Sequence, residues 1–234
     1  MDEEQKRVSE IAARSRYAEG LNTLTTRYSF AVFERYLRPG SILELGPAEG
    51  VMTECLYSKS HDLCAVEGSP LFCESLRRRF PKISVINSLF EDFETDQTFD
   101  NVILGHVLEH VYDPVLIISK VRKWLAPVGR VFAAVPNAYS LHRQAAVIMG
   151  LLKHEKELNE NDLYHGHRRV YDPETFRADF IAAGLKLEHF GGYWIKPLSN
   201  QQIEQSWSQE MVDAFMALGE RYPEIAAELY VVAS

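Results

Sequence analysis

Short apolar runs alternate with helical stretches along most of this 234-residue chain, and this alternation constrains its fold more than any other feature. The strand-like runs are mostly apolar, and they are Ser41–Leu45, Asp62–Val66, Ile83–Ile86, Asn101–Leu104 and Arg130–Val135. Helices are expected between them, beginning near Glu49, Ser69 and Asp113. Near-continuous apolar strands separated by helices indicate a parallel sheet that is covered on both faces. The sequence therefore predicts a doubly wound α/β fold.

The charge and cysteine content exclude several classes of function. The net charge is −8, from 33 acidic and 25 basic residues, which argues against sequence-independent binding of nucleic acid. The longest stretch without charged residues, Val131–His142, is far shorter than the ~20 residues of a membrane span. The acidic N-terminus Met1–Glu4 is unlike a signal peptide, and the three cysteines form no CxxC pair. We therefore expect a cytoplasmic protein that binds neither nucleic acid nor membranes.

A glycine-containing loop, Ile42–Gly50, is the sharpest local motif. It follows the first expected strand and opens a helix, where a doubly wound fold binds its cofactor. Gly46 and Gly50 allow a tight turn and a close approach of the backbone to a ligand. Glu67 ends the second expected strand, where an acid accepts both hydroxyls of an adenosine ribose. The alternative to a cofactor site is that the loop is only a tight turn and that Glu67 caps a helix.

Two carboxylates in and beside this loop discriminate between candidate cofactors. A pyrophosphate needs a G-x-G-x-x-G loop, a helix N-terminus and no nearby negative charge. This loop is G-x-x-x-G, with Glu44 before it and Glu49 inside it. Both carboxylates would repel a pyrophosphate in a partly desolvated cleft. They suit S-adenosylmethionine, which carries a ribose, an ammonium group and a sulfonium cation.

Six motifs follow one another in a fixed order along the chain. They are Glu44–Gly50, Glu67, Ser88–Phe93, Phe99–Leu104, Leu108–Pro114 and Leu125–Arg130. Together they resemble the motifs of class I S-adenosylmethionine-dependent methyltransferases of the bacterial small-molecule type. The resemblance is dense over 41–135 and implies a seven-stranded, mostly parallel sheet whose last strand is antiparallel. The chain departs from the family pattern at Ala48, which replaces a glycine, and at Ser88-Leu89, which replaces Gly-Asp.

The resemblance also implies which residues contact the cofactor and its product, S-adenosylhomocysteine. They come from the N-terminal arm, the glycine loop, the adenine loop and the ends of the second and fourth strands. The predicted cofactor-binding residues are Tyr17, Glu44, Gly46, Pro47, Ala48, Gly50, Glu67, Gly68, Leu89, Phe90, Gly105 and His106.

No internal repeat or linker divides the chain, so we expect one domain over 1–234. Its expected parts are an N-terminal helical cap (1–40), the cofactor-binding core (41–135), an acceptor or lid insertion (136–171) and the C-terminal half of the sheet (172–234). The cap should contain two helices broken near Gly20, and the insertion a helix over Leu141–Leu152. Leu185–Phe190 and Glu228–Ala233 should form the last two strands. Ligands bind beyond the carboxyl ends of the strands, so the insertion is placed to cover the acceptor.

Several of the eight histidines fall where the acceptor should bind. His106 and His110 follow the fourth strand, and His142, His165 and His167 lie in the insertion. Imidazole is the usual base for a hydroxyl acceptor, because its pKa lies near neutrality. The predicted catalytic residues are therefore His106, His110, His165 and His167.

The run His106–His110 leaves a metal alternative open. If it is helical, His106, Glu109 and His110 share one face, and His165 or His167 could complete a divalent-metal site. Similar ExxEH runs in ubiquinone-pathway O-methyltransferases and small-RNA 2′-O-methyltransferases go with metal binding. Because a histidine stands here in the first position, we expect no metal and a hydrogen-bonded structural role for the pair Glu109-His110.

The insertion contributes the predicted substrate residues, which are Tyr139, His142, Arg143 and Arg168. The segment His165–Tyr171 combines histidines, arginines and a tyrosine, which indicates an anionic or polyhydroxyl acceptor. We predict methylation of a small polar molecule, most simply O-methylation of a sugar or natural-product hydroxyl. N-methylation of a small amine and a non-catalytic binding module are the alternatives, and a homodimer is compatible with the sequence.

Overall fold

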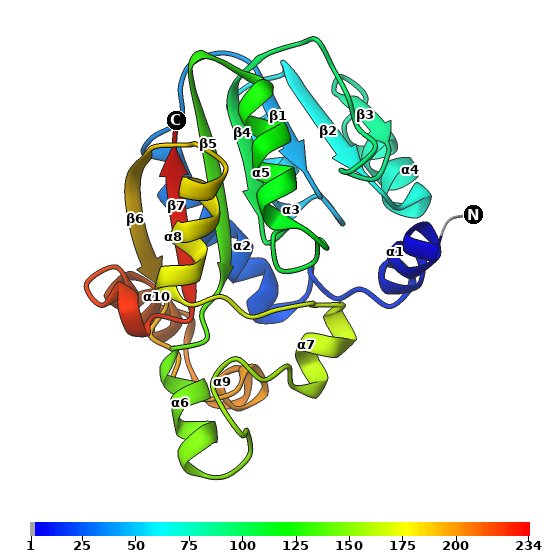
Figure 1. Ribbon diagram of the computed structural model, residues 1–234. Coiled ribbons are helices and arrows are strands. Elements are labelled where there is room, and N and C mark those ends of the chain that lie inside the picture. The colour runs from blue at the N-terminus through cyan, green and yellow to red at the C-terminus, as the bar shows by residue number, and fades with distance from the viewer. Residues whose placement is uncertain (1–2) are drawn as a thin grey trace.

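Within residues 3–234, which the computed structural model describes, seven strands form one sheet in the order β3-β2-β1-β4-β5-β7-β6 (Figure 1). The strands are β1 (Ile42–Leu45), β2 (Leu63–Glu67), β3 (Ser84–Asn87), β4 (Phe99–Gly105), β5 (Leu125–Pro136), β6 (Leu187–Tyr193) and β7 (Glu228–Ala233). The strand β7 runs antiparallel to both β5 and β6, whereas β1 to β5 pair in parallel. The prediction of a doubly wound sheet with an antiparallel last strand is confirmed.

Helices connect the strands and cover the sheet. They are α1 (Glu3–Ala13), α2 (Gly20–Glu34), α3 (Val51–Tyr57), α4 (Pro70–Arg79), α5 (Pro114–Lys123), α6 (Leu141–Ile148), α7 (Glu160–His165), α8 (Pro173–Ala182), α9 (Asn200–Ser206), α10 (Gln209–Gly219) and a short 3₁₀ helix, η1 (Pro223–Ile225). The helices α4, α5 and α8 each begin with a capping side chain followed by proline, and the caps are Ser69, Asp113 and Asp172. Such pairs favour a helix start because the cap accepts an amide hydrogen and proline lacks one.

The core consists of two apolar layers, one on each face of the sheet. On one face, Trp124 and the α8 residues Phe176 and Phe180 pack against the sheet together with α5. On the other face, α2, α3 and α10 contribute buried residues such as Phe33 and Leu56 (Figure 1). Both faces of the sheet are therefore removed from water, as parallel strands require.

The helices α1, α6, α7 and α9 lie beyond the carboxyl ends of β1, β2, β4 and β5 (Figure 1). Contacts join these distant parts of the chain: Tyr164 donates a 2.6 Å hydrogen bond to the carbonyl of Arg14, and Glu204 accepts one of 2.9 Å from the amide of Leu21. The N-terminal arm, the insertion and the 194–204 segment thus enclose the edge where a ligand of this fold binds.

Several expected boundaries are corrected by the structure. The first helix of the insertion ends at Ile148 rather than Leu152, because Gly150 adopts the left-handed conformation with φ of 73°. The strand β6 begins at Leu187 and not at Leu185. Gly20 opens α2, so the break between the first two helices lies before it.

The segment His106–His110 is a turn and not a helix, because His106 itself has a left-handed φ of 59°. Among residues 3–234, no helix is long and apolar enough to cross a membrane. The division of the chain at 40, 135 and 171 stays a prediction, and Met1 and Asp2 lie outside the described residues.

Candidate active site

A cavity of about 180 Å³, which we call the first cavity, lies at the ends of β1, β2 and β4. Most of the predicted cofactor-binding residues line it, namely Tyr17, Glu44, Gly46, Pro47, Ala48, Glu67, Gly68, Leu89, Phe90, Gly105 and His106. Gly50 does not line this cavity but precedes α3 with a left-handed φ of 81°. A Cβ atom there would lie 2.7 Å from the Leu76 side chain, so the glycine is needed for packing.

Helix α1 closes the same cavity, although none of its residues was among the predicted cofactor-binding residues. Its lining residues are Glu4, Arg7, Val8, Ile11 and Ala12. Gln5 reaches the carbonyl of Gly68 at 2.5 Å, and Glu4 accepts a 2.6 Å hydrogen bond from Arg168. Only these long-range contacts place α1 over the cavity, so no local pattern could have identified it.

Two buried carboxyl groups, those of Glu44 and Glu67, line the first cavity. The Glu44 carboxylate accepts a 2.7 Å hydrogen bond from the Thr53 hydroxyl, and burial raises its pKa to about 8. The Glu67 carboxylate accepts from the amides of Ser69 at 2.8 Å and Ala48 at 3.1 Å, and burial raises its pKa to about 7. A bound cation or hydroxyl would stabilise the ionised form of either group.

Ala48, which stands where the resembling motif has a glycine, adopts a backbone conformation typical of glycine. Ala48 has a φ of 47°, in the left-handed region that costs a non-glycine residue roughly 1–2 kcal/mol. The hydrogen bond from its amide to Glu67 helps to offset this cost. The loop therefore has the shape that a ligand requires, despite the substitution.

A second, larger cavity of about 960 Å³ lies between the N-terminal arm, the insertion and the 194–204 segment. Tyr17, Thr26 and His106 line both cavities. The two cavities therefore meet at these three residues, beside the end of β4. A donor molecule in the first cavity and an acceptor in the second would face each other there.

The His106 imidazole lies at this junction among polar side chains. Its Nε2 atom is 3.3 Å from both the Ser29 hydroxyl and the Tyr193 hydroxyl. Its Nδ1 atom is 3.6 Å from Oε1 of Glu109 and 3.8 Å from Oε2 of Glu228. Burial opposes the charge of His106, but the two carboxylates outweigh it and raise its pKa.

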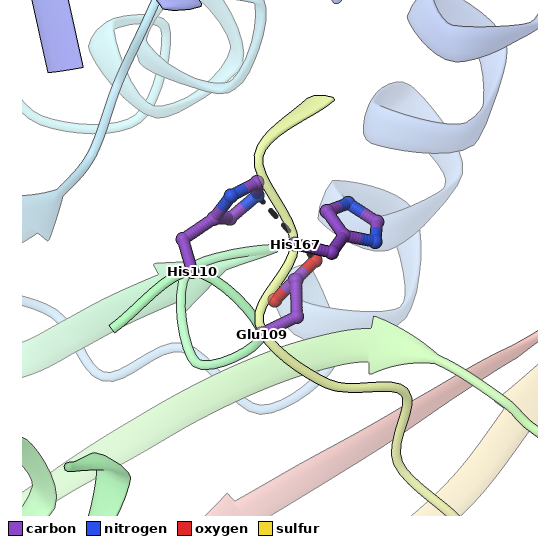
Figure 2. Close-up of side chains that lie close together, drawn as sticks. All are labelled: Glu109, His110 and His167. Carbon is purple, nitrogen blue, oxygen red and sulfur yellow. Dashed lines mark ion pairs between the residues drawn. The ribbon is translucent and has the colours of Figure 1, made fainter. Parts of the chain in front are cut away.

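Glu109, His110 and His167 converge from two segments, the turn after β4 and the loop after α7 (Figure 2). One ligand atom from each lies within 4.8 Å of the others. Burial lowers the pKa of His110 to about 3, and although burial opposes ionisation of Glu109, the nearby histidines lower its pKa to about 2. A neutral imidazole with an ionised carboxylate can bind a divalent ion, so these three residues could hold one.

The other predicted catalytic histidine, His165, lines the second cavity and packs on Tyr17, with their ring centroids 4.8 Å apart. Burial and the neighbouring His167 lower its pKa. The Tyr17 hydroxyl donates to the carbonyl of His165 at 3.2 Å and lies 3.3 Å from Nε2 of His110. Tyr17 therefore ties the N-terminal arm to both histidine-bearing segments.

The predicted substrate residues separate into two groups. His142 and Arg143 line the second cavity, whereas Tyr139 and Arg168 line neither of the two cavities. The Arg168 guanidinium donates to the carbonyl of His110 at 2.9 Å and to Glu4, so it joins α1 to the turn after β4.

Arg143 is buried and its guanidinium is already used by the insertion. It donates to Asp162 at 3.0 Å, to the carbonyl of Glu155 at 2.7 Å and to the carbonyl of Glu157. A sequence cannot reveal whether an arginine binds a ligand or backbone carbonyls, because both use the same donors. Arg143 thus holds the insertion together at the wall of the second cavity.

One wall of the second cavity comes from a segment that the sequence allowed to be either a pocket wall or a dimer face, and none of its residues was among the predicted site residues. Its residues come from 194–204 and the start of β7, and they include Trp194, Lys196, Asn200, Glu204 and Glu228. The length of the 191–223 segment was the available signal, because it is too long for a simple connection.

Comparisons with known proteins agree with this geometry. A family model described as a methyltransferase domain matches residues 13–189. A ubiquinone biosynthesis O-methyltransferase of Rhizobium etli is 29% identical over 128 residues, which are 55% of this chain and 49% of that protein. The chain thus aligns with about half the length of this relative.

Solved structures share the fold. NodS, an N-methyltransferase of Bradyrhizobium japonicum, superposes with a TM-score of 0.60 at 16% identity, covering 99% of this chain and 98% of that one. A possible histamine N-methyltransferase of Thermotoga maritima superposes with a TM-score of 0.63 at 16% identity, covering 90% and 91%. At such identities the likeness establishes the fold alone.

Proposed function

Because the chain belongs to the methyltransferase-domain family, we propose that it transfers the methyl group of S-adenosylmethionine to a hydroxyl of a small polar acceptor, such as a sugar or natural product. The prediction of a class I methyltransferase is confirmed for the family and the fold. The observation that supports this reaction is the junction of the two cavities at His106. Methyl transfer is an in-line displacement, so its main requirement is a donor and an acceptor held face to face.

In this proposal the first cavity holds the cofactor. Glu67 accepts the ribose hydroxyls, and Glu44 lies where the ammonium group of the methionine end would stabilise its carboxylate. The left-handed turns at Gly46 and Ala48 bring the backbone close to the ligand. Tyr17 and α1 close the site, and the sulfonium methyl points toward the junction.

His106 is the favoured base among the four candidates. It lines both cavities, and Glu109 and Glu228 would stabilise the imidazolium that forms when it takes the acceptor's proton. By contrast, burial lowers the pKa of His110 to about 3 and also lowers that of His165, so both are weak bases. His167 lies 3.4 Å from Asp162 and, in this proposal, positions the wall of the cavity.

N-methylation of an amine is the second candidate, and the carboxylates of Glu109 and Glu228 beside His106 favour it. An amine attacks with its lone pair and needs no strong base. A pH–rate profile that is flat through the histidine range would therefore favour the amine, and a rising profile the hydroxyl.

We also propose that the protein acts in the cytoplasm on a small molecule, without nucleic acid, as a monomer or a homodimer. The net charge of −8 supports the absence of a nucleic-acid partner, because nucleic-acid binding relies on a basic surface. Sedimentation measured with and without S-adenosylhomocysteine would distinguish the two assembly states.

Calorimetric titration of metal-stripped protein with S-adenosylhomocysteine, with NAD in parallel, tests the cofactor. We expect micromolar binding of the former and none of the latter, with Glu67→Ala weakening binding by more than about tenfold because two ribose hydrogen bonds are lost. Glu74→Ala, on the exposed face of α4, is the matched control and should bind normally. Tight binding of NAD alone would overturn the proposal, and cofactor binding without methylation of any acceptor would favour a non-catalytic module.

A further inference from the structure

The second cavity gathers buried polar atoms that make no hydrogen bond within residues 3–234. Those that line it belong to Glu109, His142, His167, Trp194, Asn200 and Glu228. Buried polar side-chain atoms are nearly always hydrogen-bonded in folded proteins. Their concentration around one cavity indicates that a polar ligand completes these hydrogen bonds.

Three of these residues, Trp194, Asn200 and Glu228, define the hydrogen-bonding chemistry of that ligand. The indole Nε1 of Trp194 can only donate, and Oδ1 of Asn200 can only accept. The Oε2 atom of Glu228 accepts when the carboxyl is ionised. Trp194 is 1% exposed and Glu228 is 9% exposed, so a partner for their unpaired atoms has to come from inside the cavity. Hydroxyl groups satisfy such a set because each one both donates and accepts.

The charges of this cavity disfavour an anionic ligand. Arg143 is paired with Asp162, and Arg169 donates to the backbone carbonyls of the turn after β4. Lys196 lies with its Nζ atom 5.0 Å from the centroid of the Trp194 ring. Arg16 also lines the cavity, with its Nε atom 4.0 Å from Oε2 of Glu19. The acidic residues of the lining outnumber these two cations, since they include Glu19, Glu109, Glu204 and Glu228. The anionic acceptor that the sequence allowed is therefore disfavoured.

We infer that Glu228 is a specificity-determining residue, which binds a hydrogen-bond donor of a polyhydroxylated, non-anionic acceptor next to the group that is methylated. Trp194 and Asn200 bind further hydroxyls of the same molecule. Because Oε2 of Glu228 is 3.8 Å from Nδ1 of His106, groups bound to these two residues must be close neighbours on the acceptor. The inference rests on the proposed function, since it takes the second cavity as the acceptor site.

Saturation-transfer NMR on protein loaded with S-adenosylhomocysteine tests this inference. The probes are methyl α-glucopyranoside, glucosamine, glucuronate and glucose 6-phosphate. We expect the neutral and the amino sugar to bind at millimolar concentrations and the two anions to bind more weakly. Glu228→Ala should weaken sugar binding by about tenfold, since a hydrogen bond to a charged group is lost.

Two further variants separate charge from shape. Glu228→Gln keeps an acceptor oxygen but removes the charge, so it should retain the neutral sugar and lose any preference for glucosamine. Glu210→Ala, on the exposed surface of α10, should bind every probe as the parent protein does. Unchanged binding of S-adenosylhomocysteine shows that each variant is folded.

Tighter binding of either anion than of the neutral sugar would overturn the inference, as would a Glu228→Ala variant that binds the sugars normally. Absence of sugar binding at millimolar concentrations, with S-adenosylhomocysteine still bound, would also overturn it and leave the proposed methyltransferase function standing. Failure of the parent protein to bind S-adenosylhomocysteine would instead contradict the proposed function.

Discussion

At the scale of single residues, Glu44 couples cofactor binding to pH. Burial raises its pKa to about 8, so the empty site holds mostly the neutral acid at pH 7. The ammonium group of the cofactor would favour the ionised form, and binding should then release a proton. We expect the affinity for S-adenosylhomocysteine to increase up to about pH 8 and then to level off.

Calorimetry in buffers of different ionisation enthalpy measures this proton release directly. Glu44→Gln should reduce the release, because it removes one of the two buried carboxyls that titrate in this cavity and keeps the shape; the remainder would come from Glu67. A parent protein whose affinity does not change between pH 6 and pH 8 would contradict this role of Glu44.

Glu109, His110 and His167 lead to a second prediction at this scale. Neither Glu109 nor His167 lines the first cavity. Removing metal with a chelator should therefore leave the affinity for S-adenosylhomocysteine unchanged. If the chelator instead lowers this affinity, and Zn²⁺ then restores the affinity in the parent protein but not in His167→Ala, a metal ion is assigned to Glu109, His110 and His167.

At the scale of elements, a buried ion pair joins the two helices of the insertion. The side chains of Arg143 and Asp162 are 5% and 8% exposed, and their charged atoms lie 3.0 Å apart. Removing one partner of such a pair costs about 3–5 kcal/mol, because the other charge stays buried and unpaired. We expect Arg143→Met to increase hydrogen exchange across α6 and α7 but not across β1 to β5, whereas Lys153→Met, exposed in the same insertion, should change neither.

The same ion pair should make the insertion sensitive to acid. Burial opposes ionisation of Asp162, but His167 and Arg143 lower its pKa to about 2, below the usual 3.8. A carboxyl with a lowered pKa stabilises the fold above its unfolded pKa, and this contribution is lost as the pH falls toward the folded pKa. The protection of α6 and α7 from hydrogen exchange, measured relative to the intrinsic exchange rate at each pH, should therefore fall between about pH 4 and pH 2, and less so in Asp162→Asn.

At the scale of the whole molecule, helix α1 covers the first cavity without being part of the core. Ala12 is its buried residue, while several of its side chains line the cavity. We expect deletion of residues 1–13 to weaken binding of S-adenosylhomocysteine by about tenfold, with little change in the unfolding temperature. An unfolded truncation product, or one with full affinity, would show that α1 has another role.

The sequence by itself determined the sheet and the part of the first cavity that the ends of its strands and the glycine loop form. Apolar strands, helix caps and a glycine loop are local patterns, and each acts within a few residues of its own position. The course of the strands was therefore predictable, and so was the position of Glu44, Gly46 and Glu67 at one end of the sheet.

Only the tertiary structure decided which side chains face the second cavity. Its walls come from segments far apart in the sequence, such as Glu19 before α2, Trp194 after β6 and Glu228 on β7. Arg143 and Arg168 show why local reasoning fails there. A guanidinium binds a ligand, a carboxylate or a backbone carbonyl with the same donors, and long-range packing alone determines which of these partners lies within reach.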